Sequence, residues 1–102
     1  MTTYMTPSAE TIATRSNAIK LHGPEAFEGM RKAGRLAAQT LDALVPHVVP
    51  GVTTGALDDL VRQMTLDAGG VLATLGYRGY QHSCCISLNN VICHGIPGER
   101  VL

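Results

Sequence analysis

The chain has 102 residues, of which 45% are hydrophobic, with eight Lys and Arg against eight Asp and Glu. This length fits one small domain or part of a larger one. The basic residues are scattered, so no stripe follows a phosphate backbone and nucleic acid is not an expected partner. Prolines interrupt the most apolar stretch, at Pro46 and Pro50, which argues against a membrane span. The chain shows no secretory leader, and its cysteines predict reduced thiols in the cytoplasm: Cys84, Cys85 and Cys93.

The first third of the chain predicts an arm and then a helix. Residues 1–17 show no useful periodicity, so we expect a mobile N-terminal arm before a domain spanning residues 18–102. From Pro24 to Leu44, apolar residues recur every three or four positions, the spacing of one helical face. Pro46 disfavours helical geometry in the residue before it, so this helix is expected to end there.

A second helix is expected to follow the turn-forming segment of residues 49–54. Thr53 or Thr54 is a suitable N-cap, and the apolar spacing continues to about Ala68, just before a pair of glycines. Asp58 and Asp59 lie in its first turn. Adjacent helical residues diverge, so we interpret these two carboxylates as a solvated helix start rather than a shared site.

The pattern then changes to short β-rich runs, and Asn89-Asn90 separates two of them. Asparagine tolerates the positive φ of a two-residue turn, so residues 84–94 are predicted to form an antiparallel hairpin. Two helices followed by strands indicate an α+β fold.

The predicted register places one cysteine beside one histidine. Counting outward from the turn pairs Leu88 with Val91, and it therefore pairs Cys85 with His94, with Cβ atoms roughly 5 Å apart. Cys93 would point to the opposite face. Because the candidate ligands divide between two faces, a tetrahedral zinc site is disfavoured. A nucleophilic dyad of Cys85 and His94 stays open as an alternative, although no third group is evident to orient the imidazole.

His94 is the strongest candidate for a functional side chain, since it lies where the hairpin leads into a tight exit that contains Gly95 and Pro97. Tyr77 and Tyr80 flank Gly79 a few residues upstream. Together the two rings can form an apolar wall suited to an aliphatic side chain.

Four segments of the chain carry a family resemblance. They read MRKAGRLAA (Met30 to Ala38), VPGVTTGALD (Val49 to Asp58), LGYRGY (Leu75 to Tyr80) and SCCISLNNVICHGIPGE (Ser83 to Glu99). With these segments the chain resembles the N-terminal portion of the bacterial type I methionine aminopeptidases. The last segment is the most specific of the four.

The resemblance implies the first half of a pita-bread (creatinase/aminopeptidase-like) fold. It also implies a hydrolase that removes the initiator methionine from new proteins whose second residue is small, using two divalent metal ions such as Co, Mn, Fe, Zn or Ni. In this family, the histidine matching His94 contacts the substrate near the scissile amide. The residues that line the methionine side-chain pocket match Tyr77, Tyr80, Cys85 and Thr74.

The metal ligands of the family lie beyond the residue that matches Leu102. We therefore expect no metal ligand in this chain and no aminopeptidase activity from it alone. The alternative is a non-catalytic module that binds N-terminal peptides. The expected partners are the N-terminal peptides of nascent proteins, with ribosome association for the complete enzyme, which we expect to be monomeric.

Overall fold

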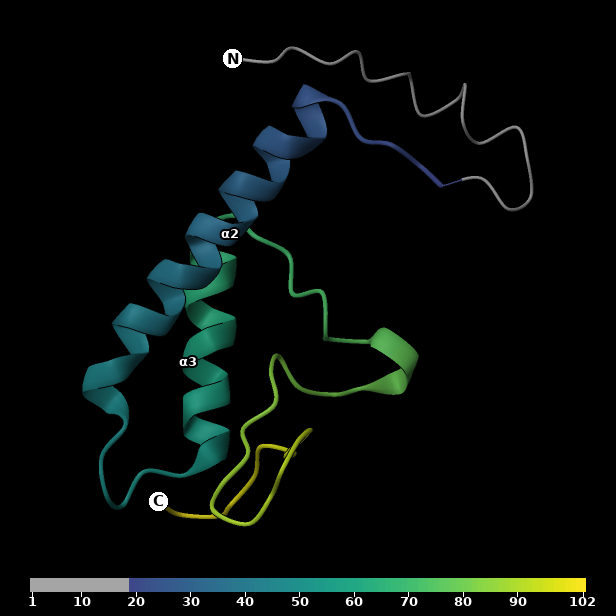
Figure 1. The fold of residues 1–102 in the computed structure, drawn as a ribbon. Coiled ribbons are helices and arrows are strands. Elements are labelled where there is room, and N and C mark those ends of the chain that lie inside the picture. The colour runs from purple at the N-terminus through teal and green to yellow at the C-terminus, as the bar shows by residue number, and fades with distance from the viewer. Residues whose placement is uncertain (1–18) are drawn as a thin grey trace. The chain divides into compact units, whose positions relative to one another are not determined.

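The computed structural model describes residues 19–102, so the predicted N-terminal arm lies outside the described residues. Helix α2 spans Pro24–Leu44, as the sequence predicted (Figure 1). The chain continues into a 3₁₀ helix, η1, at Val45–His47, where Pro46 occupies an early position that needs no backbone N–H donor. The chain divides after Arg35 into two units, and the second contains residues 36–102.

Helix α3 spans Thr54–Asp67 and confirms the second predicted helix. Thr53 is its N-cap, and the Thr53 side chain accepts a hydrogen bond from the Ala56 N–H at 3.1 Å. The helix ends before Gly69, whose φ of +78° is the left-handed geometry that glycine adopts without steric cost. Leu57 is the most buried apolar side chain of the described residues, at 2% exposure.

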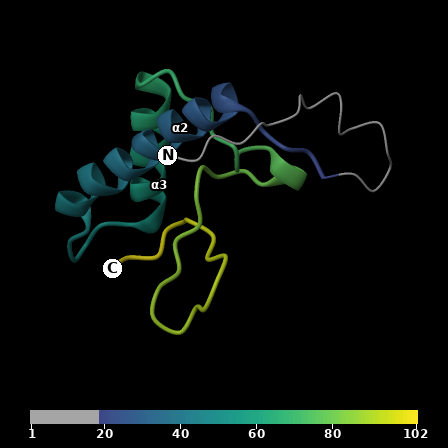
Figure 2. The ribbon, with the colours of Figure 1, turned by 45° about the horizontal axis from the view of Figure 1, so that its top comes forward.

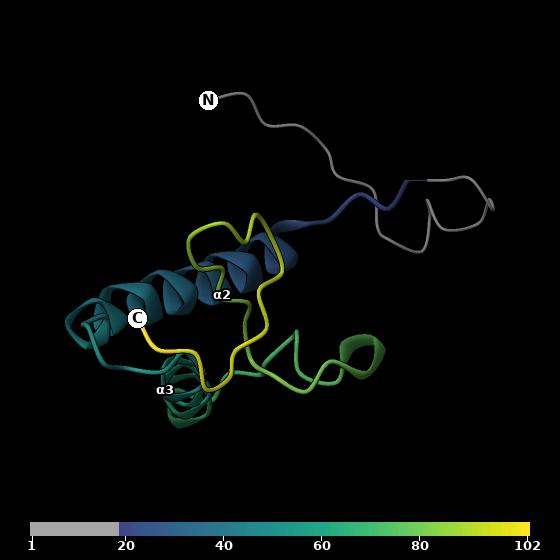
Figure 3. The ribbon, with the colours of Figure 1, turned by 90° about the horizontal axis from the view of Figure 1, so that it is seen from below.

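The last residues of the chain pair with the segment that leads into α3, in the unit that begins at Leu36. Thr53 and Val101 form an isolated antiparallel bridge. Backbone hydrogen bonds extend this pairing on both sides, from Gly51 N–H to Leu102 O and from Thr54 N–H to Arg100 O. Figures 2 and 3 show the yellow C-terminal segment passing the N-terminal end of α3.

The predicted hairpin is not confirmed, because no strand is assigned within residues 19–102. The turn itself is present: Asn89 has a φ of +52°, and the Val91 N–H donates to Leu88 O at 2.9 Å. The predicted register is wrong, however. Ile86 donates its N–H to Gly95 O at 2.8 Å, whereas the predicted register placed Cys93 opposite Ile86.

The physical reason for the register change lies in the second limb of the loop. His94 has a φ of +55°, so the backbone is not extended there and the second limb bulges. Ile86 therefore pairs with Gly95, two residues further along the chain than predicted. Regular pairing therefore stops after the turn. The two α-helices confirm the helical part of the predicted α+β fold, whereas the predicted strands are not confirmed within residues 19–102.

Candidate functional site

The peptide segment Ser83-Cys84 forms the centre of the candidate site, because four side-chain contacts satisfy its backbone. One carboxylate oxygen of Asp58, Oδ1, accepts the N–H groups of Ser83 and Cys84, each at 2.9 Å. The Thr74 hydroxyl donates to Ser83 O. The Tyr80 hydroxyl donates to Cys84 O at 2.8 Å. All four backbone polar groups of this dipeptide are thus bound by three side chains.

The structure brings Tyr80 and Cys85 together. The Cys85 thiol donates to the Tyr80 hydroxyl at 3.5 Å between sulfur and oxygen. That hydrogen bond, followed by desolvation, raises the pKa of Tyr80 to about 12. Tyr80 therefore stays a neutral phenol at neutral pH, with its ring edge-on to His82 at 5.5 Å between centroids.

Thr74 and Tyr77 take different places in this part of the chain. Thr74 belongs to the cluster through its bond to Ser83, although its own surface is exposed. Tyr77 lies in the 3₁₀ helix η2 (Tyr77–Gly79), is exposed, and has the guanidinium carbon of Arg78 at 5.4 Å from its ring centre. The predicted wall of Tyr77 and Tyr80 stays a prediction.

His94 does not join the cluster. Its side chain is exposed, and no hydrogen bond connects it to Cys85 within residues 19–102. The predicted cross-strand neighbourhood of Cys85 and His94 followed from the register, which the bond between Ile86 and Gly95 overturns. The arrangement gives no support to a Cys85-His94 nucleophilic dyad.

Asp58 is the residue whose role sequence reasoning missed. The prediction of a solvated carboxylate is right for exposed Asp59 and wrong for Asp58, which is only 6% exposed. Besides the two backbone N–H groups, Asp58 Oδ1 accepts the Cys84 thiol at 3.2 Å, and its other oxygen lies 3.7 Å from His82 Nδ1. The sequence placed Asp58 in the first turn of the helix, but no acidic residue lies in that turn of α3. The available sequence signal was helical spacing, since Asp58 follows buried Thr54 by four positions.

Burial and the Asp58 contact also set the chemistry of Cys84. Desolvation, followed by the hydrogen bond to Asp58, raises the pKa of the Cys84 thiol to about 12. The thiolate is the nucleophilic form, so Cys84 is expected to be inert near neutral pH. All three cysteines are free of disulfides: Cys84, Cys85 and Cys93.

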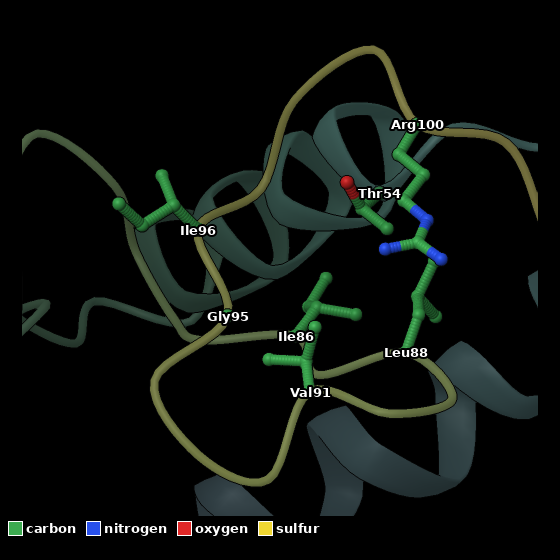
Figure 4. Close-up of a pocket in the computed structure, with 7 residues that line it drawn as sticks. All are labelled: Thr54, Ile86, Leu88, Val91, Gly95, Ile96 and Arg100. Atoms are coloured by element: carbon green, nitrogen blue, oxygen red, sulfur yellow. The ribbon is translucent and has the colours of Figure 1, made fainter.

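A second feature of the same unit is a shallow hollow of about 70 Å³ next to the Asn89-Asn90 turn (Figure 4). Ile86 and Val91 project into it from the two limbs of the turn loop, and Thr54 and Arg100 border it. It has room for a few atoms only. Its lining is mainly aliphatic, so it offers no group of converging polar side chains that would fix a substrate.

The described residues do not provide a metal centre. Across residues 19–102 there is no group of three or more His, Cys, Asp or Glu side chains that could hold a metal ion. Metal sites in proteins need several converging ligands, so a divalent metal does not fit the residues described.

No helix within residues 19–102 has the combination of length and apolar character that crossing a membrane requires.

Comparison with known proteins decides the family. The model of "metallopeptidase family M24" matches residues 28–102. The chain belongs to this family. An M24 relative, a methionine aminopeptidase of Escherichia coli (strain K12), is 49% identical over 86 residues, which are 83% of this chain and 33% of that protein. Methionine aminopeptidase 2 of Mycobacterium tuberculosis is 51% identical over 79 residues, 78% of this chain and 28% of that protein.

The M24 likeness extends to three dimensions. A crystal structure of methionine aminopeptidase from Rickettsia prowazekii superimposes with a TM-score of 0.79 at 45% identity, over 82% of this chain and 34% of that one. The fold is therefore that of the corresponding part of an M24 metallopeptidase. The chain spans about a third of the length of the relatives it matches.

Proposed function

We propose that this chain contributes the methionine side-chain pocket of an aminopeptidase that removes initiator methionine from proteins with a small second residue. The observation that carries the proposal is the contact of Tyr80 with Cys85, on a loop that is also fastened by Thr74. A polarizable thiol beside an aromatic ring suits a thioether side chain. The names of the M24 relatives support the same substrate.

In this proposal His94 contacts the substrate peptide near the scissile amide. Its exposed imidazole, held at a left-handed backbone position, is available to a group outside the described residues. In the complete enzyme, Tyr77 would line the same pocket, with its exposed ring covered by the substrate or by residues outside the described range. Hydrogen bonding from His94 would stabilise the developing charge on the substrate amide.

We expect the two divalent ions of the complete enzyme to be held by residues other than those described. The chain by itself is then inactive. The test is to incubate the purified chain and Met-Ala-Ser with Co²⁺, Mn²⁺ or Fe²⁺ and to measure free methionine. No methionine should be released, and turnover by the isolated chain would overturn this part of the proposal.

A fusion tests the positive part of the proposal. Residues 19–102 are joined to the remaining two thirds of the E. coli relative, replacing the part of that protein which they match. The fusion should release methionine from Met-Ala-Ser with added metal, and His94→Ala in the same fusion should lower kcat by about a hundredfold. A folded fusion that releases no methionine would contradict the proposed function.

A second candidate is a non-catalytic module that binds N-terminal peptides. It is favoured by one observation: the Thr74, Tyr80 and Cys85 cluster forms in residues 19–102, where no metal-binding group is found. Calorimetric titration of the isolated chain separates the candidates. Saturable binding of Met-Ala-Ser, but not of Ala-Ala-Ser, would favour the module.

The partners and the compartment follow from the same proposal. The substrates are the N-terminal peptides of nascent proteins, so the complete enzyme would work in the cytoplasm near ribosomes, as a monomer and without binding nucleic acid. The unpaired thiols of the three cysteines support a reducing compartment. Cell fractionation of the full-length protein would test this placement.

A further inference from the structure

We propose that Asp58 is a positioning residue: from its buried place in α3, just past the first turn, it holds the loop that places Tyr80 and Cys85 in the pocket. The proposal rests on the proposed function for the meaning of that pocket. The anchoring itself rests on geometry alone, since Asp58 touches neither of the two pocket side chains through a hydrogen bond. It acts on them through the Ser83-Cys84 peptide.

The first step of the argument is the concentration of donors on one buried oxygen. Asp58 Oδ1 accepts Ser83 N–H, Cys84 N–H and the Cys84 thiol within 3.2 Å. Hydrogen bonds to a charged acceptor are roughly twice as strong as neutral ones. The acceptor and its donors are 25 and 26 positions apart in sequence, so these bonds fix a loop to a helix rather than shaping one local turn.

The second step is that the other side of the same dipeptide is bound by pocket residues. Thr74 donates to Ser83 O, and Tyr80 donates to Cys84 O. Cys85 follows directly and donates its thiol to Tyr80. A displacement of the dipeptide from Asp58 would therefore move Tyr80 and Cys85 together.

The third step is burial. Ser83 is 7% exposed, and its Oγ has no hydrogen-bond partner among the described residues, so this side chain does not hold the loop. Buried backbone N–H groups that lose their acceptor must reach water or remain unsatisfied. Removing the Asp58 carboxylate should therefore drive Ser83 and Cys84 toward solvent.

The test uses the full 102-residue chain and needs no peptide. Four single variants are compared with the wild type: Asp58→Ala, Asp58→Asn, Asp59→Asn and Ser83→Ala. Iodoacetamide is added at pH 8, and the alkylation rate of each cysteine is followed by fragment mass spectrometry. In parallel, ¹⁵N-resolved NMR spectra report the amides of α3 and of the loop, including Tyr80 and Cys85.

The expected result is graded. Asp58→Ala should raise the alkylation rate of Cys84 about tenfold or more and shift the Tyr80 and Cys85 amides, while the α3 amides keep their positions. Asp58→Asn retains an acceptor oxygen and should give a smaller rise. Asp59→Asn and Ser83→Ala should leave Cys84 as slow as in the wild type.

Two results would overturn the anchoring role. One is wild-type positions of the Tyr80 and Cys85 amides in Asp58→Ala, even if Cys84 reacts faster, because loss of the Asp58 hydrogen bond by itself lowers the pKa of Cys84. The other is loss of the α3 amide pattern in both Asp58 variants, which would make Asp58 a residue needed for folding in general. The proposed function is tested by a different experiment, methionine release from the folded fusion. If the fusion releases no methionine, the alkylation and NMR results on the role of Asp58 still stand.

Discussion

Replacing Gly95 by alanine should open the turn loop, because a Cβ atom at this position has no room. An ideal Cβ would lie 2.1 Å from Ile86 O, 2.8 Å from Ile86 C and 2.9 Å from Ser87 Cα. All three atoms belong to backbone, so no side-chain rotation relieves the overlap. The two limbs of the loop must separate for the alanine to fit.

The cost can be worked from the bonds that would break. Gly95 O accepts the Ile86 N–H at 2.8 Å, and the Gly95 N–H donates to Ser87 Oγ at 3.1 Å. At about 1 kcal/mol net for each hydrogen bond, the loop loses about 2 kcal/mol. That loss corresponds to a roughly thirtyfold larger population of the locally open loop.

Amide hydrogen exchange at Ile86 measures this opening directly. The matched control is Gly98→Ala, because a Cβ at Gly98 would meet nothing within 4 Å. Exchange at Ile86 should rise about thirtyfold in Gly95→Ala and stay unchanged in Gly98→Ala. Equal exchange in both variants would refute the reasoning.

The remaining predictions concern the helices and one thiol. Thr53→Ala removes the cap on Ala56 and should destabilise α3 by about 1 kcal/mol in urea titrations, whereas Thr53→Ser should not; equal stability of the two would count against the cap. Gly34→Ala, with nothing within 4 Å of the new Cβ, should stabilise α2 by about 0.5–1 kcal/mol and so raise the helical signal in circular dichroism. An unchanged helical signal would contradict that. The folded-state pKa of Cys84 is raised from 9.0 to about 12, so between these pH values the folded state keeps a thiol proton that the unfolded state loses. The free energy of unfolding should therefore fall as pH rises from 9 toward 12. Denaturation curves across this range test the sign, and Cys84→Ala should have a weaker pH dependence.

The helices could be predicted from sequence because their signals are local. The apolar spacing, the proline after Leu44 and the threonine before α3 each act on the residues beside them, and the observed bounds of α2 and α3 follow. The candidate pocket stays a prediction. Family resemblance named Tyr80 and Cys85, whose contact the structure shows.

The loop around His94 depended on information that local patterns do not carry. Alternation of side chains assumed extended backbone, whereas Asn89 and His94 have positive φ. The bonds that hold Ser83 and Cys84 come from Asp58, on a helix that precedes them by 25 and 26 positions. Spacing from Thr54 can place Asp58 on the buried side of α3, but it cannot show that its carboxylate binds a loop 25 positions away.

The pairing of the C-terminal segment with the entrance of α3 has a consequence for the order of folding. Thr54 and Gly98, joined through the Thr54 hydroxyl, are 44 positions apart. Closing a flexible loop of that size costs about 3 kcal/mol in chain entropy, whereas each helix forms from neighbouring residues. We expect the helices to form first and the contact at Thr54 to form late, so a folding φ-value should be high within α3 and near zero at Val101.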